Sequence, residues 1–264
     1  MWVNGSSPGA SDVANFSNGG DATVAGNVSA NSLTLGADTT LSGNGSYTLT
    51  TGSNNPLAGG HTLTVDGAKV VFSTEFALGT SGNNLTVNSG SVTMSGYGGM
   101  EVSATNWQFD INGGTVDIAG NYNYITGSGD AIAQTAGTVT VTGKPLELGN
   151  STATYTLSGG TLTTIGLTFT SGAAFNFVGT SGTLFLKNSG SQPWNFASLT
   201  GIANSLFEVN GVAATSGHLA FVTGSGVPSG YTQISAVVPE PASIGLLGLG
   251  GLGLLLLGKR RKTA

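Results

Sequence analysis

The chain has 264 residues, of which 45 are glycine, 7% are charged and none is cysteine. Ordinary globular domains carry roughly 25% charged residues, yet 39% of this chain is hydrophobic and these residues alternate with Thr, Ser and Asn. That pattern indicates a β-protein with tight turns rather than a disordered chain. Without cysteine, disulfides and thiolate metal sites are excluded.

The charges are unevenly distributed along the chain. Residues 1–258 hold all twelve acidic residues and only three lysines, a net charge of −9, whereas residues 259–264 carry +4. An acidic body free of arginine suits nucleic acid poorly, because phosphates require cations. We therefore expect no nucleic-acid partner.

Residues 1–62 predict the first β-coils or a cap, because short alternating segments such as SLTLG (32–36) and SYTLT (46–50) occur there. The first residues, from Met1 and Trp2 onward, show neither the basic start nor the apolar core of a signal peptide. We expect that the natural start of the protein lies further upstream and includes such a peptide.

A repeat with a near-constant period fills residues 63–187, which we predict to form the regular part of the fold. Five ten-residue segments align without gaps, and their starts are 22, 24, 23 and 23 residues apart. A looser sixth segment with two extra residues follows at 175–186. The aligned segments are LTVDGAKVVF (63–72), LTVNSGSVTM (85–94), FDINGGTVDI (109–118), IAQTAGTVTV (132–141) and YTLSGGTLTT (155–164).

Each repeat predicts two strands joined by a corner. Apolar residues occupy positions 1, 3, 8 and usually 10, and a spacing of two places side chains on one face of a strand. Gly or Ala with Ser, Asn or Asp fills the positions between the two pairs and supplies a turn. We expect the first positions to form one internal ladder, which contains Leu63, Leu85, Phe109, Ile132 and Tyr155.

Two architectures fit the repeat. In a β-solenoid each period is one coil, and equivalent apolar residues stack in the interior. In an antiparallel sandwich or meander each repeat is a hairpin. The near-constant period favours the solenoid, so the predicted fold is all-β: a right-handed parallel β-helix or solenoid of about 23-residue coils, plus one C-terminal transmembrane helix.

Beyond the repeat the pattern changes twice. Residues 188–223, which include Pro193 and Trp194, predict an irregular C-terminal cap that has room for a helix. Residues 224–238, with Pro228 and few charges, predict a linker.

The last predicted unit, residues 239–262, combines an apolar span with a basic end. Ala242 to Gly258 are 17 uncharged residues, which as a helix would span about 25 Å, the low edge of what crosses a bilayer. The alternative is a buried core helix, which the adjoining cations disfavour. Four cations fix the membrane orientation by keeping the C-terminus in the cytoplasm: Lys259, Arg260, Arg261 and Lys262.

The order of motifs at this end is specific. Val238-Pro-Glu-Pro-Ala-Ser243, an apolar span and a basic end together resemble the PEP-CTERM sorting signal of Gram-negative bacteria. The resemblance implies processing by the membrane enzyme exosortase, with Pro239, Glu240 and Pro241 as recognition residues. It also implies export, anchoring of the body outside the cytoplasm at the inner membrane, and final placement on the cell surface or in the extracellular matrix.

A second resemblance covers most of the body. Runs such as Asn112–Ile118 and Ser158–Thr164, with their Gly-Gly-Thr cores, resemble the autotransporter-associated β-strand repeats of surface proteins. The opening of the chain, from Trp2 to Gly36, is similar to the N-terminal modules of exported PEP-CTERM proteins.

Parallel β-helices include pectate-lyase-like enzymes, which need clustered acidic residues or calcium ligands. Asp110 and Asp117 lie in one repeat and have room on one outer face, and Asp66 lies at a nearby position of another repeat. Their equivalents in other repeats are Thr, Ala and Ser, so we interpret them as a solvated face. His61 and His218 lie far apart and read as surface or cap residues. We therefore predict no catalytic residue, metal site or cofactor.

Four aromatic residues cluster between residues 97 and 124 and have the chemistry to stack on sugar rings. We favour the other interpretation, that they fill irregular loops and solenoid edges, and keep a polysaccharide partner as the best binding hypothesis. They are Tyr97, Trp107, Tyr122 and Tyr124.

Two function hypotheses follow. The first is an exported, non-catalytic structural or adhesive protein of the surface or matrix, which needs only the repeats, the polar outer faces and the sorting tail. The second is a polysaccharide-active or polysaccharide-binding β-helix protein. The expected partners are exosortase, the inner membrane and, in both hypotheses, extracellular polysaccharide.

Overall fold

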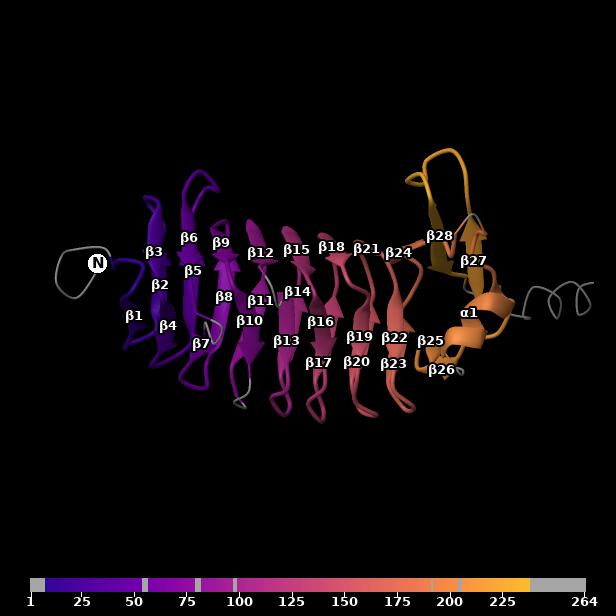
Figure 1. The fold of residues 1–264 in the computed structure, drawn as a ribbon, viewed down its shortest axis with the longest axis horizontal. Coiled ribbons are helices and arrows are strands. Elements are labelled where there is room, and N and C mark those ends of the chain that lie inside the picture. Colours follow the sequence, from indigo (N-terminus) through magenta and orange to yellow (C-terminus); the bar gives the residue numbers. More distant parts are fainter. Residues whose placement is uncertain are drawn as a thin grey trace, which may run out of the picture.

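Successive coils of the chain stack along one axis, and each coil contributes one strand to each of three faces of a β-solenoid (Figure 1). The computed structural model describes residues 8–53, 57–78, 82–96, 99–190, 192–203 and 206–237. Within each sheet, neighbouring strands of the regular coils are three strands apart in sequence. This is the topology that a helical winding of the chain produces.

The first strand of each coil lies in one of two sheets. Sheet A is formed in the early coils by β1 (Val13–Phe16), β4 (Ser32–Leu35) and β7 (Leu57–Ala58). Sheet D is formed in the later coils by β10 (Glu75–Leu78), β13 (Gly99–Val102), β16 (Tyr122–Ile125), β19 (Leu146–Leu148) and β22 (Leu167–Phe169).

The second and third strands of each coil form two long sheets. Sheet B runs through β2 (Gly20–Thr23), β5 (Thr39–Ser42), β8 (Thr62–Asp66), β11 (Asn84–Val87), β14 (Gln108–Ile111), β17 (Ala131–Gln134), β20 (Thr154–Leu157), β23 (Ala174–Phe177), β25 (Phe207–Val209) and β26 (Val212–Ala213). Sheet C runs through β3 (Val28–Ala30), β6 (Thr48–Thr51), β9 (Lys69–Phe72), β12 (Ser91–Ser95), β15 (Thr115–Gly120), β18 (Thr138–Gly143), β21 (Thr161–Thr164), β24 (Thr183–Lys187), β28 (Tyr231–Ala236) and β27 (Leu219–Val222).

The parallel register confirms the solenoid and rules out the hairpin alternative for the repeats. The predicted ladder is present, because each of its residues is the register partner of the next and all are at most 1% exposed. The ladder continues from Tyr155 to Phe175 and Phe207. Its members in the repeat are Leu63, Leu85, Phe109, Ile132 and Tyr155. The hand of the coil stays a prediction.

A polar residue interrupts the ladder that the third positions of the repeats form, and its polar groups are all paired. Gln134 occupies the apolar third position of its repeat and is fully buried. Its Oε1 accepts a 2.6 Å hydrogen bond from the Tyr155 hydroxyl, and its Nε2 donates to the carbonyls of Gly137 and Thr161. A buried amide with all these partners carries little desolvation penalty.

The corners explain the glycine content. Gly137 and Gly160 have φ of 74° and 72°, in the left-handed region that favours glycine. A Cβ at Gly160 would lie 2.4 Å from the carbonyl oxygen of Gly137, the equivalent corner of the preceding coil. The stacked corners therefore require glycine both for backbone conformation and for space.

The C-terminal end of the solenoid is closed by the chain itself. The short helix α1 (Phe196–Ala203), β25–β26 and the β27–β28 hairpin lie together at this end (Figure 1). β28 falls within residues 224–238, where the sequence predicts a linker. It pairs antiparallel with both β24 and β27. Its residues Thr232, Ile234 and Ala236 face inward and complete the core.

The predicted transmembrane helix lies outside the described residues. In the part of the chain that the structure describes, no helix has both the length and the apolar character needed to cross a membrane.

Candidate functional site

The outer face of sheet D collects the acidic and aromatic side chains that the rest of the solenoid surface lacks in such density. One outward row across the sheet contains Ala77, Glu101, Tyr124, Glu147 and Thr168. The row beside it contains Glu75, Gly99 and Tyr122. We call these residues the sheet D outer face.

A hydrogen-bonded chain joins three residues of this face. Glu75 lies diagonal to Glu101 on the neighbouring strand, because Glu75 is the register partner of Gly99 and Ala77 that of Glu101. The two carboxyl groups are hydrogen-bonded to each other, and the Tyr124 hydroxyl also bonds to Glu101. Ionising both carboxyl groups at once is therefore unfavourable.

The network sets the protonation of its members. The hydrogen bond to Glu101, then burial and the neighbouring negative charge raise the pKa of Glu75 to about 7. Hydrogen bonds from Glu75 and Tyr124 lower the pKa of Glu101 below its usual range. Burial and the bond to Glu101 raise the pKa of the Tyr124 hydroxyl. The two carboxyl groups therefore titrate as a pair, which keeps one proton up to a pH of about 7.

Two of the predicted aromatic residues lie on this face. Tyr122 is 44% exposed, and its ring centroid lies 6.2 Å from that of Tyr124 in an edge arrangement. Trp107 does not belong with them: it is fully buried between Phe76 and Phe109, so it is not available to stack on a sugar ring. Tyr97 lies outside the described residues.

The three aspartates considered for catalysis do not meet. Asp110 lies on the outer face of sheet B, whereas Asp117 lies on the outer face of sheet C. The idea that both share one face is therefore wrong. Burial raises the pKa of Asp110. Asp66 is exposed at the end of β8, where it accepts a 2.6 Å hydrogen bond from Ser89 Oγ.

The two histidines are also separate. His61 Nδ1 lies 3.6 Å from Asp38 Oδ1, so His61 has a carboxylate neighbour that sequence separation conceals. His218 lies in the C-terminal cap, where its Nδ1 accepts a hydrogen bond from the Thr215 backbone N–H.

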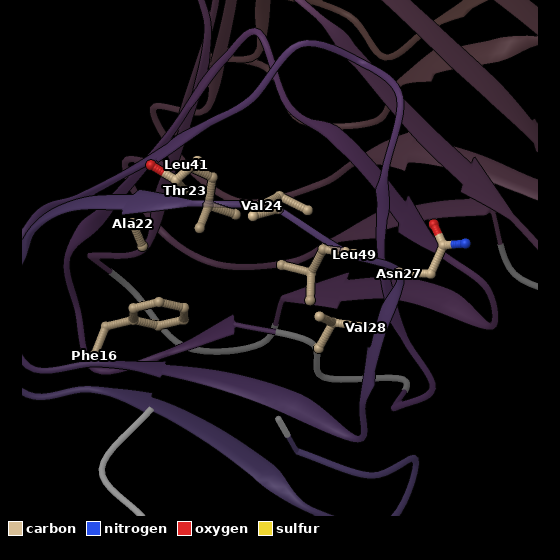
Figure 2. A pocket seen from close by; sticks show the side chains of 10 residues that line it. Phe16, Ala22, Thr23, Val24, Asn27, Val28, Leu41 and Leu49 are labelled. Carbon is tan, nitrogen blue, oxygen red and sulfur yellow. The ribbon is translucent and has the colours of Figure 1, made fainter. Parts of the chain in front are cut away.

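A cavity of about 280 Å³ lies in the first coil, at the opposite end from the cap (Figure 2). Phe16, Val24 and Val28 point into it from the coil itself, and Leu41 and Leu49 from the next coil. Its lining is mostly apolar, and no acidic or basic side chain is among its lining residues. It is the end of the hydrophobic core rather than a site for chemistry.

Sequence reasoning missed the Glu75–Glu101 pair, although a signal for this face exists. Glu101, Tyr124 and Glu147 are spaced by 23 residues, the period of the repeat. That spacing places them in one outward row once the strands of sheet D are recognised.

Chemically, the face offers carboxyl groups and aromatic rings to a polar partner. Glycosidases hold their two carboxyl groups at least about 5 Å apart, so that both reach the scissile bond. Glu75 and Glu101 instead hydrogen-bond each other. The arrangement therefore suits binding of hydroxyl groups better than cleavage of a glycosidic bond.

The other predicted site lies at the end of the chain. Residues 237–262 match the family described as the PEP-CTERM protein-sorting motif. Of these, only Val237 belongs to the described residues; the predicted recognition residues and the basic cluster follow it in sequence. They are Pro239, Glu240, Pro241, Lys259, Arg260, Arg261 and Lys262. Neither the curated proteins nor the solved structures contain a match to this chain.

Proposed function

We propose that this chain, which carries a PEP-CTERM protein-sorting motif at residues 237–262, is an exported, exosortase-processed structural or adhesive protein of the cell surface or matrix. The observation that carries the proposal is the direct fusion of this motif to a β-solenoid body. The motif supplies sorting, and the solenoid supplies an elongated body to display.

The outer faces of the solenoid support a structural or adhesive role. On sheet C, one outward row is hydroxyl-bearing except for Lys69, and consecutive members are register partners. Such a surface presents the same hydrogen-bonding groups coil after coil without a large charge. The row consists of Thr48, Lys69, Ser91, Thr115, Thr138, Thr161 and Thr183.

A second candidate is attachment to extracellular polysaccharide through the sheet D outer face. Tyr122 and Tyr124 supply rings for stacking, and Glu101 and Glu147 supply acceptors for sugar hydroxyls. The mutual hydrogen bond between Glu75 and Glu101 favours binding over catalysis. We therefore propose a non-catalytic role.

The test of the sorting proposal is expression, behind an added export signal, in a host with a matching exosortase and in the same host without the enzyme. We expect the wild-type chain to shorten only when exosortase is present. Replacing Pro239, Glu240 and Pro241 with alanine removes two prolines, a residue type whose fixed φ favours an extended backbone. This variant should accumulate at full length in the membrane fraction.

Pro228→Ala is the matched control, because Pro228 lies in the exposed loop between β27 and β28 and outside the motif. It should be processed like the wild type. Equal processing of the alanine variant and the wild type would refute the sorting proposal.

A further inference from the structure

The folded body reaches the sorting motif without a free linker. The Val237 N–H donates a 2.8 Å hydrogen bond to the His218 carbonyl, so the chain is held to the cap up to the first residue of the matched motif. Only Val238 separates Val237 from Pro239. Two residues of fully extended chain reach at most about 7 Å, which is the longest reach that the chain has between Val237 and Pro239.

The strand that ends there is firmly built into the cap. β28 is the middle strand of three, and pairs antiparallel with β24 on one side and β27 on the other. Its inward residues Thr232 and Ile234 are fully buried. Thr232 Oγ1 also donates a 2.7 Å hydrogen bond to Asn188 Oδ1 and accepts one from the Trp194 N–H.

The strength of this attachment falls toward the motif. Ala236 is the small residue of the inward row, and Val237 is 40% exposed beyond the end of the strand. The last residues of an element unpair at a lower free-energy cost than its interior residues. Residues 235–237 end the strand and bury less side-chain surface than the fully buried Ile234, so they are the first to unpair.

We propose that β28 is a latch that limits access of the processing enzyme to the sorting motif, so that processing follows unpairing of residues 235–237. The inference rests on the proposed function. An enzyme that acts on an extended segment needs backbone free of other hydrogen bonds on both sides of its target. With β28 fully paired, one residue separates Val237 from Pro239 in sequence; after unpairing to Ile234, the stretch from Ile234 to Pro239 can extend to roughly 17 Å.

The test is insertion of a flexible Gly-Ser segment of about eight residues, which spans roughly 15 Å, between Val237 and Val238. This insertion leaves the strands of the cap and residues 238–262 unchanged and removes the need for unpairing. In the exosortase host we expect a several-fold shorter half-time of processing. The control is the same insertion after Gly226, in the exposed β27–β28 loop, which lengthens the chain without altering the approach to the motif and should process like the wild type.

A second arm weakens the latch itself. Ile234→Ala removes buried contacts of β28 and should also shorten the half-time, whereas Val222→Ala, at a 44% exposed position of the adjacent strand, should not. Trp194 fluorescence reports whether the cap stays folded, because the Trp194 backbone is bonded to Thr232.

Each outcome decides the proposal. A half-time that is unchanged or longer after the insertion at Val237 would overturn the latch, even if Ile234→Ala speeds processing through general loosening of the cap. Failure of the wild type to shorten in the exosortase host would instead refute the proposed function, which keeps the two failures distinguishable.

Discussion

At the scale of single residues, Glu75 and Glu101 show how the solenoid creates properties that neither residue has alone. Their carboxyl groups interact because the register of β10 against β13 places Glu75 diagonal to Glu101. The shared proton has a consequence for stability. Glu75 has a pKa of about 7 in the folded chain and an ordinary value of 4.5, so the folded chain binds the extra proton between these pH values.

We therefore expect the titration of Glu75 to contribute stability that is fully present below pH 4.5 and is lost as the pH rises through about 7. Glu75→Gln keeps a hydrogen-bond donor for Glu101 without the titration, so it should flatten the decline in melting temperature between pH 5 and pH 8. Glu147→Gln, on the same face, is the matched control and should leave the decline unchanged. A decline that is identical in wild type and Glu75→Gln would contradict the proton-sharing account.

At the scale of the strand, the fold depends on which side of the sheet a residue faces. Leu162 is fully buried in sheet C, and Thr163 beside it faces outward between Thr140 and Phe185. Leu162→Asp would place an unpaired charge in the core, which costs several kcal/mol. Thr163→Asp would place the same group in water.

We expect Leu162→Asp to lower the melting temperature strongly or prevent folding, and Thr163→Asp to change it little. We choose Thr163 rather than its outward-facing register partner Thr140 as the control. The other register partner of Thr140 is Asp117, which would repel a new carboxylate at position 140. Circular dichroism melts of both variants provide the comparison. Similar melting temperatures would mean that the assignment of inner and outer faces is wrong.

The strands of the repeat were predictable because their apolar residues alternate at a constant period, as in Leu85, Val87 and Val92. The strands of sheet D were not, since segments as short as Leu146–Leu148 carry too few residues to establish alternation. β28 was missed for another reason. Its inward row includes the polar Thr232 and the small Ala236, and its partner β24 is distant in sequence.

The same contrast holds for the candidate site. The outward orientation of Asp110 and Asp117 follows from their apolar neighbours in sequence, and the structure places both on outer faces. Their separation onto two sheets depends on where the chain turns within a coil. The Glu75–Glu101 contact depends on the register of β10 against β13, which local sequence does not specify.

At the scale of the whole molecule, the two ends of the solenoid differ. The C-terminal end is closed by α1 and the antiparallel strands, and the sorting motif begins directly after β28. The N-terminal coil holds the apolar cavity instead (Figure 2). The capped end of the solenoid is therefore the end that is joined to the sorting motif, and the sheets extend from this end toward the N-terminal coil (Figure 1).

The central claim is that this body stands outside the cytoplasm while the basic tail stays inside, and cysteine labelling tests it most directly because the chain has no cysteine of its own. Thr168→Cys places a thiol at an exposed position of sheet D, and Thr263→Cys places one beyond the basic cluster. Both chains, behind an export signal in a host without exosortase, are treated with a membrane-impermeant maleimide. We predict labelling of Thr168→Cys in intact cells and of Thr263→Cys only after permeabilisation; labelling of Thr168→Cys only after permeabilisation would contradict the account.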